Sequence, residues 1–346
     1  MEINSLYYII LLVFLVLSCL EVLKKEIFYQ KKTLFLILSL IVIGFCGLRP
    51  TNLDKDIQMY HDYFNSFCGF TYQDIFFNNT HRIKEKGYII LNKLFCNFGF
   101  RPMVFTFALI GLGIKSFIIS KKATYPITAL YIYIALFLPL REFTQIRDAI
   151  ASSFLFISFF LFLDKRFFSS IVLFLVALSF HLVALIYIPV VLLLVLLKKE
   201  HYYSILLLFG GLLFFIKPTQ WIIDLTLLPD QIMKYNKIQG EGSFLILIFG
   251  IIVLLFYHYS KSALRFYSDL ELVFLVKLSY IGVFFGLITL HHAVLSRISN
   301  ALFFFVILLF VRVICFWKII QMKYLILFFL LCFYYFGMRN FNLIIY

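Results

Sequence analysis

Long apolar runs separated by short polar links follow one another along most of this chain. They lie at about residues 6–23, 33–48, 102–119, 123–140, 143–163, 167–180, 182–197, 202–216, 243–260, 270–290, 298–316 and 323–340. About 20 apolar residues in a helix cross the hydrocarbon core of a bilayer, so the runs are typical of membrane-spanning helices. The stretch 167–197 is too long for one crossing, and we expect it to break near His181. The pattern predicts an all-α polytopic integral membrane protein with about 10 to 12 transmembrane helices.

Two longer polar segments interrupt the apolar runs, at about 49–101 and 217–242. Within the first, residues 54–67 place apolar side chains at helical spacing: Ile57, Tyr60, Phe64 and Phe67. This spacing predicts a short amphipathic helix lying in the membrane interface. The stretch 87–100 predicts either a second interfacial helix or a short span.

Basic residues gather in the short links between alternate pairs of apolar runs, as in Lys121 with Lys122, Lys165 with Arg166, and Lys198 with Lys199. Because Lys and Arg are enriched in cytoplasmic links, this predicts that both termini and both polar segments face the exterior. No room is left for a separate soluble domain, so residues 1–346 form a single transmembrane domain with extracytoplasmic loops at 49–101 and 217–242.

Composition excludes several classes of protein. Apolar residues make up 63% and charged residues 14% of the chain, whereas soluble domains average about 25% charged residues. The net charge of +14 belongs largely to the topology signals, so no nucleic acid partner is expected. The cysteines form no CxxC or Cys/His pattern and most lie in apolar runs, so we expect neither a metal site nor a disulfide framework. No cofactor is expected either.

Four arginines lie at the predicted outer ends of spans: Arg49, Arg141, Arg147 and Arg297. Arg147 and Arg297 fall in or beside the first turn of a helix, where free N–H groups already present positive partial charge. Arginine there is unfavourable unless an anion is bound, which predicts a phosphate-bearing ligand. The alternative is local ion pairing, with Asp148 beside Arg147 and Glu142 beside Arg141.

Helical phase separates the two central arginines. Arg141, Gln145 and Asp148 share a face, whereas Arg147 points about a third of a turn away. Arg49 follows the C-terminal end of its helix, where the macrodipole already favours a cation.

Two further polar positions are candidates for acid–base chemistry. His181 lies inside an apolar run, where an ionisable side chain is either functional or caps a broken helix. Asp56 and Tyr60 are one helical turn apart and could orient or deprotonate a sugar hydroxyl. A solvated interfacial helix is the alternative for this pair.

These polar islands, in order, resemble the EpsG family of bacterial integral membrane proteins, which includes Wzy-type polymerases of O-antigen and capsular polysaccharide. Five segments carry the resemblance: GLRPTNLDKDIQMYHDYF with Arg49, Asp56 and Tyr60; EKGYIILNKLF with Glu85 and Tyr88; QIRDAIASSFLF with Arg147; LSFHLVALIYIP with His181; and LSRISNALFFF with Arg297. The chain departs from the family pattern at Lys55, where Gly is frequent, and at Asp148, where Gln is common.

The resemblance implies a membrane glycosyltransferase, with a GT-C-like helix arrangement as one option, in the bacterial plasma (inner) membrane. Its active site would face the periplasm or exterior. A glycan on undecaprenyl pyrophosphate would pass to a sugar hydroxyl of a second lipid-linked repeat unit, releasing undecaprenyl pyrophosphate. Arg147 and Arg297 would bind the pyrophosphate, with Arg49, Arg141 and Gln145 as weaker members. Asp56 or His181 would be the base, with Tyr60 positioning the acceptor.

The expected partners are undecaprenyl-pyrophosphate-linked glycans, membrane lipid, a chain-length regulator protein and a flippase. The alternative functions are a lipid-linked oligosaccharide flippase or other transporter, an O-antigen ligase and a sugar acyltransferase. Charged residues inside the predicted spans are few, chiefly Lys115 and Lys277. Because transporters place polar groups near the bilayer midplane, this scarcity favours an outward-facing enzyme.

Overall fold

The computed structural model describes residues 3–23, 31–51, 53, 55–77, 85–217, 244–261, 269–315 and 320–345. The chain divides into two compact units. The first comprises Met1–Leu185 with Trp317–Tyr346, and the second comprises Ile186–Phe316. The boundary, which the sequence does not predict, follows closely after the expected break near His181.

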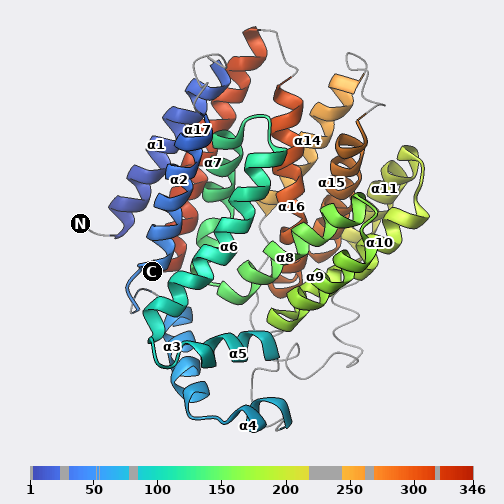
Figure 1. Cartoon of the computed structure of the whole chain (residues 1–346). Coiled ribbons are helices and arrows are strands. Elements are labelled where there is room, and N and C mark those ends of the chain that lie inside the picture. Colours follow the sequence, from blue (N-terminus) through green and yellow to red (C-terminus); the bar gives the residue numbers. More distant parts are fainter. Residues whose placement is uncertain are drawn as a thin grey trace. The chain divides into compact units, whose positions relative to one another are not determined.

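The first unit is built of membrane helices together with three shorter helices from the first polar segment (Figure 1). Its α-helices are α1 (Ile3–Leu23), α2 (Lys31–Gly47), α3 (Lys55–Cys68), α4 (Tyr72–Phe77), α5 (Lys86–Leu94), α6 (Phe100–Lys122), α7 (Pro126–Leu136), α8 (Ile146–Leu163), α9 (Phe167–Phe180) and α17 (Ile320–Ile345). Within this unit α6 packs against α2 and α8, and α1 packs against α7 and α17.

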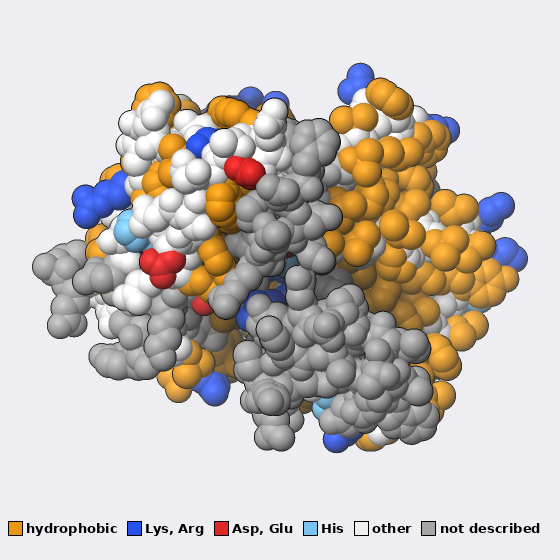
Figure 2. Space-filling view, turned by 90° about the horizontal axis from the view of Figure 1, so that it is seen from below, with side chains coloured by type: hydrophobic (Ala, Val, Ile, Leu, Met, Phe, Trp, Pro, Cys, Tyr) orange, Lys and Arg blue, Asp and Glu red, His pale blue; other side chains and the backbone are white. Residues whose placement is uncertain are grey.

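The second unit consists of α10 (Tyr187–Leu196), α11 (Glu200–Ile216), α14 (Phe244–Lys261), α15 (Leu270–Thr289) and α16 (Ala293–Ile314). Its α15 packs against each of the other four helices. Large apolar side chains of α10 and α11 stay exposed, among them Leu192, Leu208 and Phe215, and a broad apolar surface is visible on this side in Figure 2. Lipid chains are the natural cover for such a surface.

Each apolar run predicted to be a helix contains one. Six helices in the described part of the chain are long and apolar enough to cross a membrane, and the other apolar helices have 10–17 residues. The all-helical, multi-pass membrane character is therefore confirmed, while the number of crossings stays a prediction.

The expected break near His181 is confirmed. α9 ends at Phe180, and His181 has an extended backbone with φ −161° and ψ 139°. A short 3₁₀ helix, η3 (Leu182–Ile186), then leads into α10. The long apolar stretch is thus two helices.

A second interruption was not expected. α7 ends at Leu136 and is followed by a π-helical turn, η2 (Leu138–Phe143), before α8 begins at Ile146. Pro139 lies in this turn; proline has no N–H to donate and disturbs a regular α-helix. Single π-helical turns often occur at functional sites, and this one carries Arg141 and Glu142.

The first polar segment forms α3, α4 and α5, here called the cap. α3 and α5 lie near the first turn of α6, and α4 packs against α5 (Figure 1). The predicted helix at 54–67 is confirmed as α3, although Asp54 lies outside the described residues. Its apolar face is buried, but against protein: Tyr60, Phe64 and Phe67 share a core with Tyr88 and Phe107. The face predicted to rest on lipid therefore attaches the cap to the helices.

Of the two alternatives for the stretch 87–100, the structure excludes the short membrane span. α5 has nine residues, which span about 14 Å at 1.5 Å per residue, too short to cross a hydrocarbon core of about 30 Å. The other predicted loop, 217–242, lies outside the described residues apart from Lys217.

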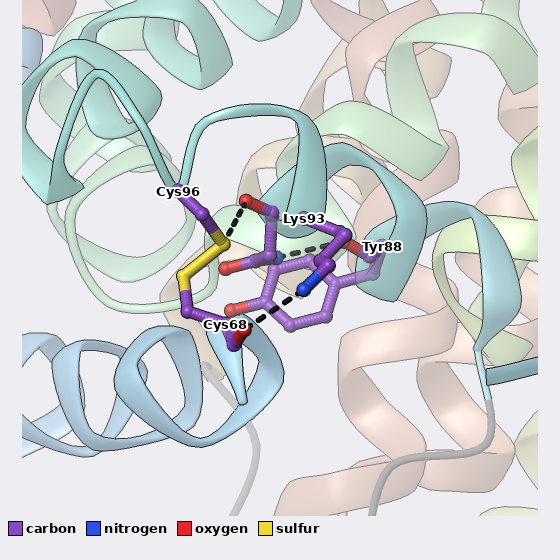
Figure 3. Close-up of a disulfide and its surroundings, with 5 residues drawn as sticks. Cys68, Tyr88, Lys93 and Cys96 are labelled. Atoms are coloured by element: carbon purple, nitrogen blue, oxygen red, sulfur yellow. Dashed lines mark hydrogen bonds between the residues drawn. A yellow bond between two sulfur atoms is a disulfide. The ribbon is translucent and has the colours of Figure 1, made fainter. Parts of the chain in front are cut away.

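A disulfide joins Cys68, at the end of α3, to Cys96, after α5 (Figure 3). The expectation of no disulfide is therefore wrong. Lys93 supports the link, since its Nζ donates to the Cys68 carbonyl oxygen at 2.8 Å. The signal was present in the sequence, because only these two cysteines fall in the polar segment 49–101 while the other four lie in or beside apolar runs.

Candidate functional site

Polar side chains from separate helices converge where the cap meets the other helices of the first unit. Arg147 is the second residue of α8, and its Nη1 donates to Glu85 Oε2 at 3.2 Å. Glu85 directly precedes α5. The two side chains are 17% and 12% exposed, so the pair lies near the surface of the site and not deep in the core.

Two tyrosines of the cap complete the surroundings of Arg147. Its guanidinium carbon lies 5.5 Å from the centre of the Tyr88 ring and 6.0 Å from that of Tyr60, within the range of a cation–π interaction. Tyr60 interacts with the Arg147 guanidinium, but among the residues that the structure describes none accepts a hydrogen bond from the buried Arg147 Nε. One donor of this guanidinium therefore remains available to an anionic ligand.

The tyrosines stay protonated at neutral pH. Burial raises the pKa of Tyr60, an effect that the nearby Arg147 opposes, and burial likewise raises the pKa of Tyr88. Both phenols can therefore orient groups through hydrogen bonds, but neither supplies a phenolate base.

Arg141 pairs with Asp148, with 3.5 Å between Nη1 and Oδ2, and both side chains are almost fully buried. Arg141 and Asp148 therefore meet, but not on one continuous helix as predicted, because Arg141 lies in the π-helical turn η2 and α8 begins only at Ile146. Arg147 is directed elsewhere, to Glu85. Gln145 is the N-cap residue of α8, and its side chain makes no capping hydrogen bond. Local ion pairing is therefore present, but with partners other than those considered from the sequence. Asp148 binds Arg141, Arg147 binds Glu85, and the Glu142 carboxylate binds Lys115.

A buried network surrounds Glu142. Its Oε1 accepts hydrogen bonds from Lys115 Nζ at 2.7 Å and from the Tyr133 hydroxyl at 2.5 Å. Lys115 also donates to the Ala149 carbonyl oxygen at 2.7 Å. A Cβ at Gly111 would lie 3.0 Å from Glu142 Oε2, so this glycine lets the carboxylate approach α6. Sequence reasoning noted Lys115 as unusual but did not find its partner, because the pairing depends on how α6 packs.

Arg49 lies beside this network. Its Nη1 donates to the Glu142 carbonyl oxygen at 2.7 Å, and its guanidinium carbon lies 4.9 Å from the Phe143 ring centre. A cavity of about 10 Å³, comparable to one water molecule, is lined by residues that include Arg49, Cys46 and Glu142. Arg49 and Arg141 are thus both buried with protein contacts, and their predicted contact with substrate stays a prediction.

His181 and Asp56 differ in how they are held. His181 Nδ1 accepts a hydrogen bond from the Val183 N–H at 3.1 Å, so its side chain caps the start of η3 and does not use this nitrogen for a free carbonyl of α9. This bond assigns the proton to Nε2 in the neutral ring, which leaves a donor and no lone pair on that nitrogen. Asp56 is partly buried on α3 and acts electrostatically on Tyr60.

Arg297 belongs to the second unit, where it is the fifth residue of α16 and has an exposed side chain. The N-terminus of this helix is capped by His292, whose Nδ1 accepts from the Leu295 N–H at 3.2 Å. Arg147 and Arg297 therefore lie in different units, and a site shared by them stays a prediction.

Metal-binding side chains do not cluster in the described ranges: no group of three or more His, Cys, Asp or Glu residues is placed to hold an ion. The side chains around Arg147 provide guanidinium, carboxylate and phenol groups. Sequence reasoning had quoted Glu85 and Tyr88 as parts of a motif without giving them a role. Their contacts with Arg147 supply one.

Comparison with known proteins assigns the family. Neither the curated proteins nor the solved structures gave a match to this chain. The sequence model described as the EpsG family matches residues 32–344, which includes the cap, Arg147, His181 and Arg297. The match covers almost the whole sequence, and the chain belongs to the EpsG family.

Proposed function

We propose that this protein is a polysaccharide polymerase: a glycosyltransferase that joins undecaprenyl-pyrophosphate-linked oligosaccharide repeat units at the outer face of the bacterial plasma membrane. Family membership supports a polymerase-type membrane protein. The observation that carries the proposal is Arg147, a cation in the first turn of α8 that pairs, among the described residues, with one partly exposed carboxylate.

The physical reason lies in the leaving group. When the anomeric carbon leaves undecaprenyl pyrophosphate, negative charge develops on the pyrophosphate oxygen. A preorganised guanidinium beside helix N–H groups stabilises that charge without reorganisation. Arg147 is suited to this role, and the sequence predicts Arg297 as a second cation. Tyr60 and Asp56 of the cap would hold the acceptor repeat unit.

Two observations support an exterior location for the cap. The cap lies at the N-terminal end of α6, and basic residues lie at the other end, where Lys121 and Lys122 are in its last turn. Such residues favour the cytoplasm. The Cys68–Cys96 disulfide is typical of an oxidising compartment and rare in the cytosol.

The test is the length distribution of surface polysaccharide on a gel after deletion of this chain. Wild-type and Arg147→Ala versions are added back at matched membrane levels. We expect deletion to reduce the ladder to a single repeat unit on its acceptor, and only wild type to restore it. Complete loss of surface glycan would instead identify a flippase or ligase, and an unchanged ladder with altered side groups would identify an acyltransferase.

A further inference from the structure

Glu85 forgoes the usual role of an acidic residue at its position. It is the N-cap residue of α5 with an extended backbone, φ −74° and ψ 96°, yet its side chain makes no capping hydrogen bond. The shorter side chain of an aspartate at this position normally accepts from the first N–H groups of the helix. Here the Glu85 side chain points to Arg147 instead.

The Glu85–Arg147 pair is suited to exchange. It has one N···O contact of 3.2 Å, and both side chains are partly exposed, whereas a firm arginine–carboxylate pair has two parallel hydrogen bonds. A diphosphate carries more charge and more acceptor oxygens than one carboxylate, so it can take the guanidinium from Glu85. The buried Arg147 Nε, for which the described residues provide no acceptor, gives the incoming oxygen a second donor.

Glu85 is also better placed for proton transfer than the other acidic and basic candidates. His181 offers an N–H at Nε2 because its Nδ1 accepts from the Val183 N–H, and burial keeps the Tyr60 phenol protonated. Asp56 already acts on Tyr60, whereas Glu85 becomes a released carboxylate in the site once the diphosphate takes its contact with Arg147.

We propose that Glu85 holds Arg147 until the donor diphosphate displaces it, and that the released carboxylate then accepts the proton of the acceptor hydroxyl. This inference rests on the proposed function. The acceptor oxygen forms a bond to the anomeric carbon as the bond from that carbon to the pyrophosphate oxygen breaks. Its electron pair stays on undecaprenyl pyrophosphate, and the hydroxyl proton moves to Glu85, which afterwards releases it to water.

The exchange is tested with inorganic pyrophosphate binding to the purified full-length protein in detergent, measured by titration calorimetry. Glu85→Gln removes the competing charge at nearly constant volume, so we expect pyrophosphate to bind about three- to tenfold more tightly, the range for one partly exposed ion pair and one like charge. Arg147→Ala should abolish binding. The control is Asp62→Asn, which removes an exposed carboxylate from α3 in the same cap and should leave affinity unchanged.

The proton step is tested by single-turnover transfer with lipid-linked repeat units. Glu85→Gln should lower the rate by about 10²- to 10⁴-fold, the usual contribution of a general base, while Glu85→Asp retains part of it. Unchanged or weaker pyrophosphate binding by Glu85→Gln would overturn the exchange, and wild-type transfer rates would overturn the base. If wild type binds pyrophosphate but transfers no glycan, the proposed function fails with the proton step, while the affinity change still decides the exchange.

Discussion

Two ion pairs of the first unit differ in almost every respect. Lys115 and Glu142 are each 1% exposed and lie 2.7 Å apart, and both make further hydrogen bonds, to the Ala149 carbonyl and the Tyr133 hydroxyl respectively. Arg147 and Glu85 are 17% and 12% exposed, with a single contact of 3.2 Å. The first pair is fully enclosed, and the second is open to a competing ligand.

The difference indicates that the first pair serves stability and the second pair serves activity. A buried pair resists removal of one partner because the remaining charge is stranded in a low-dielectric interior. A partly exposed pair contributes little to stability and can be exchanged. We therefore expect substitutions in the first pair to lower stability, and substitutions in the second pair to lower transfer activity with the fold intact.

Breaking the enclosed pair should have the largest effect. Lys115→Met leaves Glu142 buried and uncompensated, which we expect to cost about 3–5 kcal/mol of stability. Thermal unfolding in detergent measures the loss. The double variant Lys115→Met with Glu142→Gln removes both charges and should recover much of it. Equal stability of the single and double variants would show that the pair is not coupled.

Removing Arg147, the partly exposed cation, should lower activity and leave stability nearly unchanged. Arg147→Ala is expected to reduce glycosyl transfer by about 10²- to 10³-fold, as loss of one preorganised donor does in other enzymes, while the unfolding temperature changes little. Arg147→Lys keeps the charge but loses the planar fork and should retain an intermediate rate. A large drop in stability for Arg147→Ala would make this pair structural after all.

The Gly87→Ala substitution tests whether the position of α5 in the cap keeps Glu85 in contact with Arg147. The added Cβ would lie 2.2 Å from Ser179 Oγ and 3.0 Å from the Ser179 carbonyl oxygen, so α5 must shift away from α9. Overpacking of this kind costs about 1–3 kcal/mol, and transfer should fall as Glu85 moves. Gly44→Ala is the matched control, because its Cβ meets nothing within 4 Å. Equal behaviour of the two alanine variants would contradict this reading of the cap.

The smallest effect is expected at a third ion pair, in the second unit, where Arg312 donates to Asp269. Burial acts to raise the pKa of Asp269, but the hydrogen bonds from Arg312 and the Leu272 N–H outweigh it, so the pKa lies below its usual value. Its contribution is thus present above about pH 4 and is lost as pH falls further.

Because the Asp269 side chain is 39% exposed, screening should hold this contribution below about 1 kcal/mol. Asp269→Asn should flatten the dependence of the unfolding temperature on pH between 5 and 3 only slightly. A contribution of Asp269 as large as the stability loss expected for Lys115→Met would contradict the link between exposure and stability.

The sequence predicted features that depend on local spacing. Apolar runs located the helices, because the hydrocarbon core sets their length and polarity. Arg141 and Asp148 meet as helical phase predicts, although the π-helical turn interrupts the continuous helix that the prediction assumed. His181 was expected at a break because the run around it was too long for one span.

Features that depend on packing between distant segments were not predicted. Glu85 meets Arg147, and Lys115 meets Glu142, only once α5 and α6 are placed against the residues around the start of α8. The π-helical turn at 138–143 depends on how Pro139 is accommodated, which periodicity does not reveal. The spacing of the cysteines does not predict the disulfide, whereas the shared location of Cys68 and Cys96 in the polar segment 49–101 does indicate it.

The Cys68–Cys96 crosslink also has a consequence for the biogenesis of the protein. Cys68 ends α3 and Cys96 precedes α6, so the bond closes only after the whole segment between α2 and α6 has been delivered to an oxidising compartment. On the proposed orientation, that delivery happens only when α1 and α2 have inserted correctly. The crosslink would then act as a checkpoint on assembly, since a misinserted chain would never lock Glu85 into position opposite Arg147.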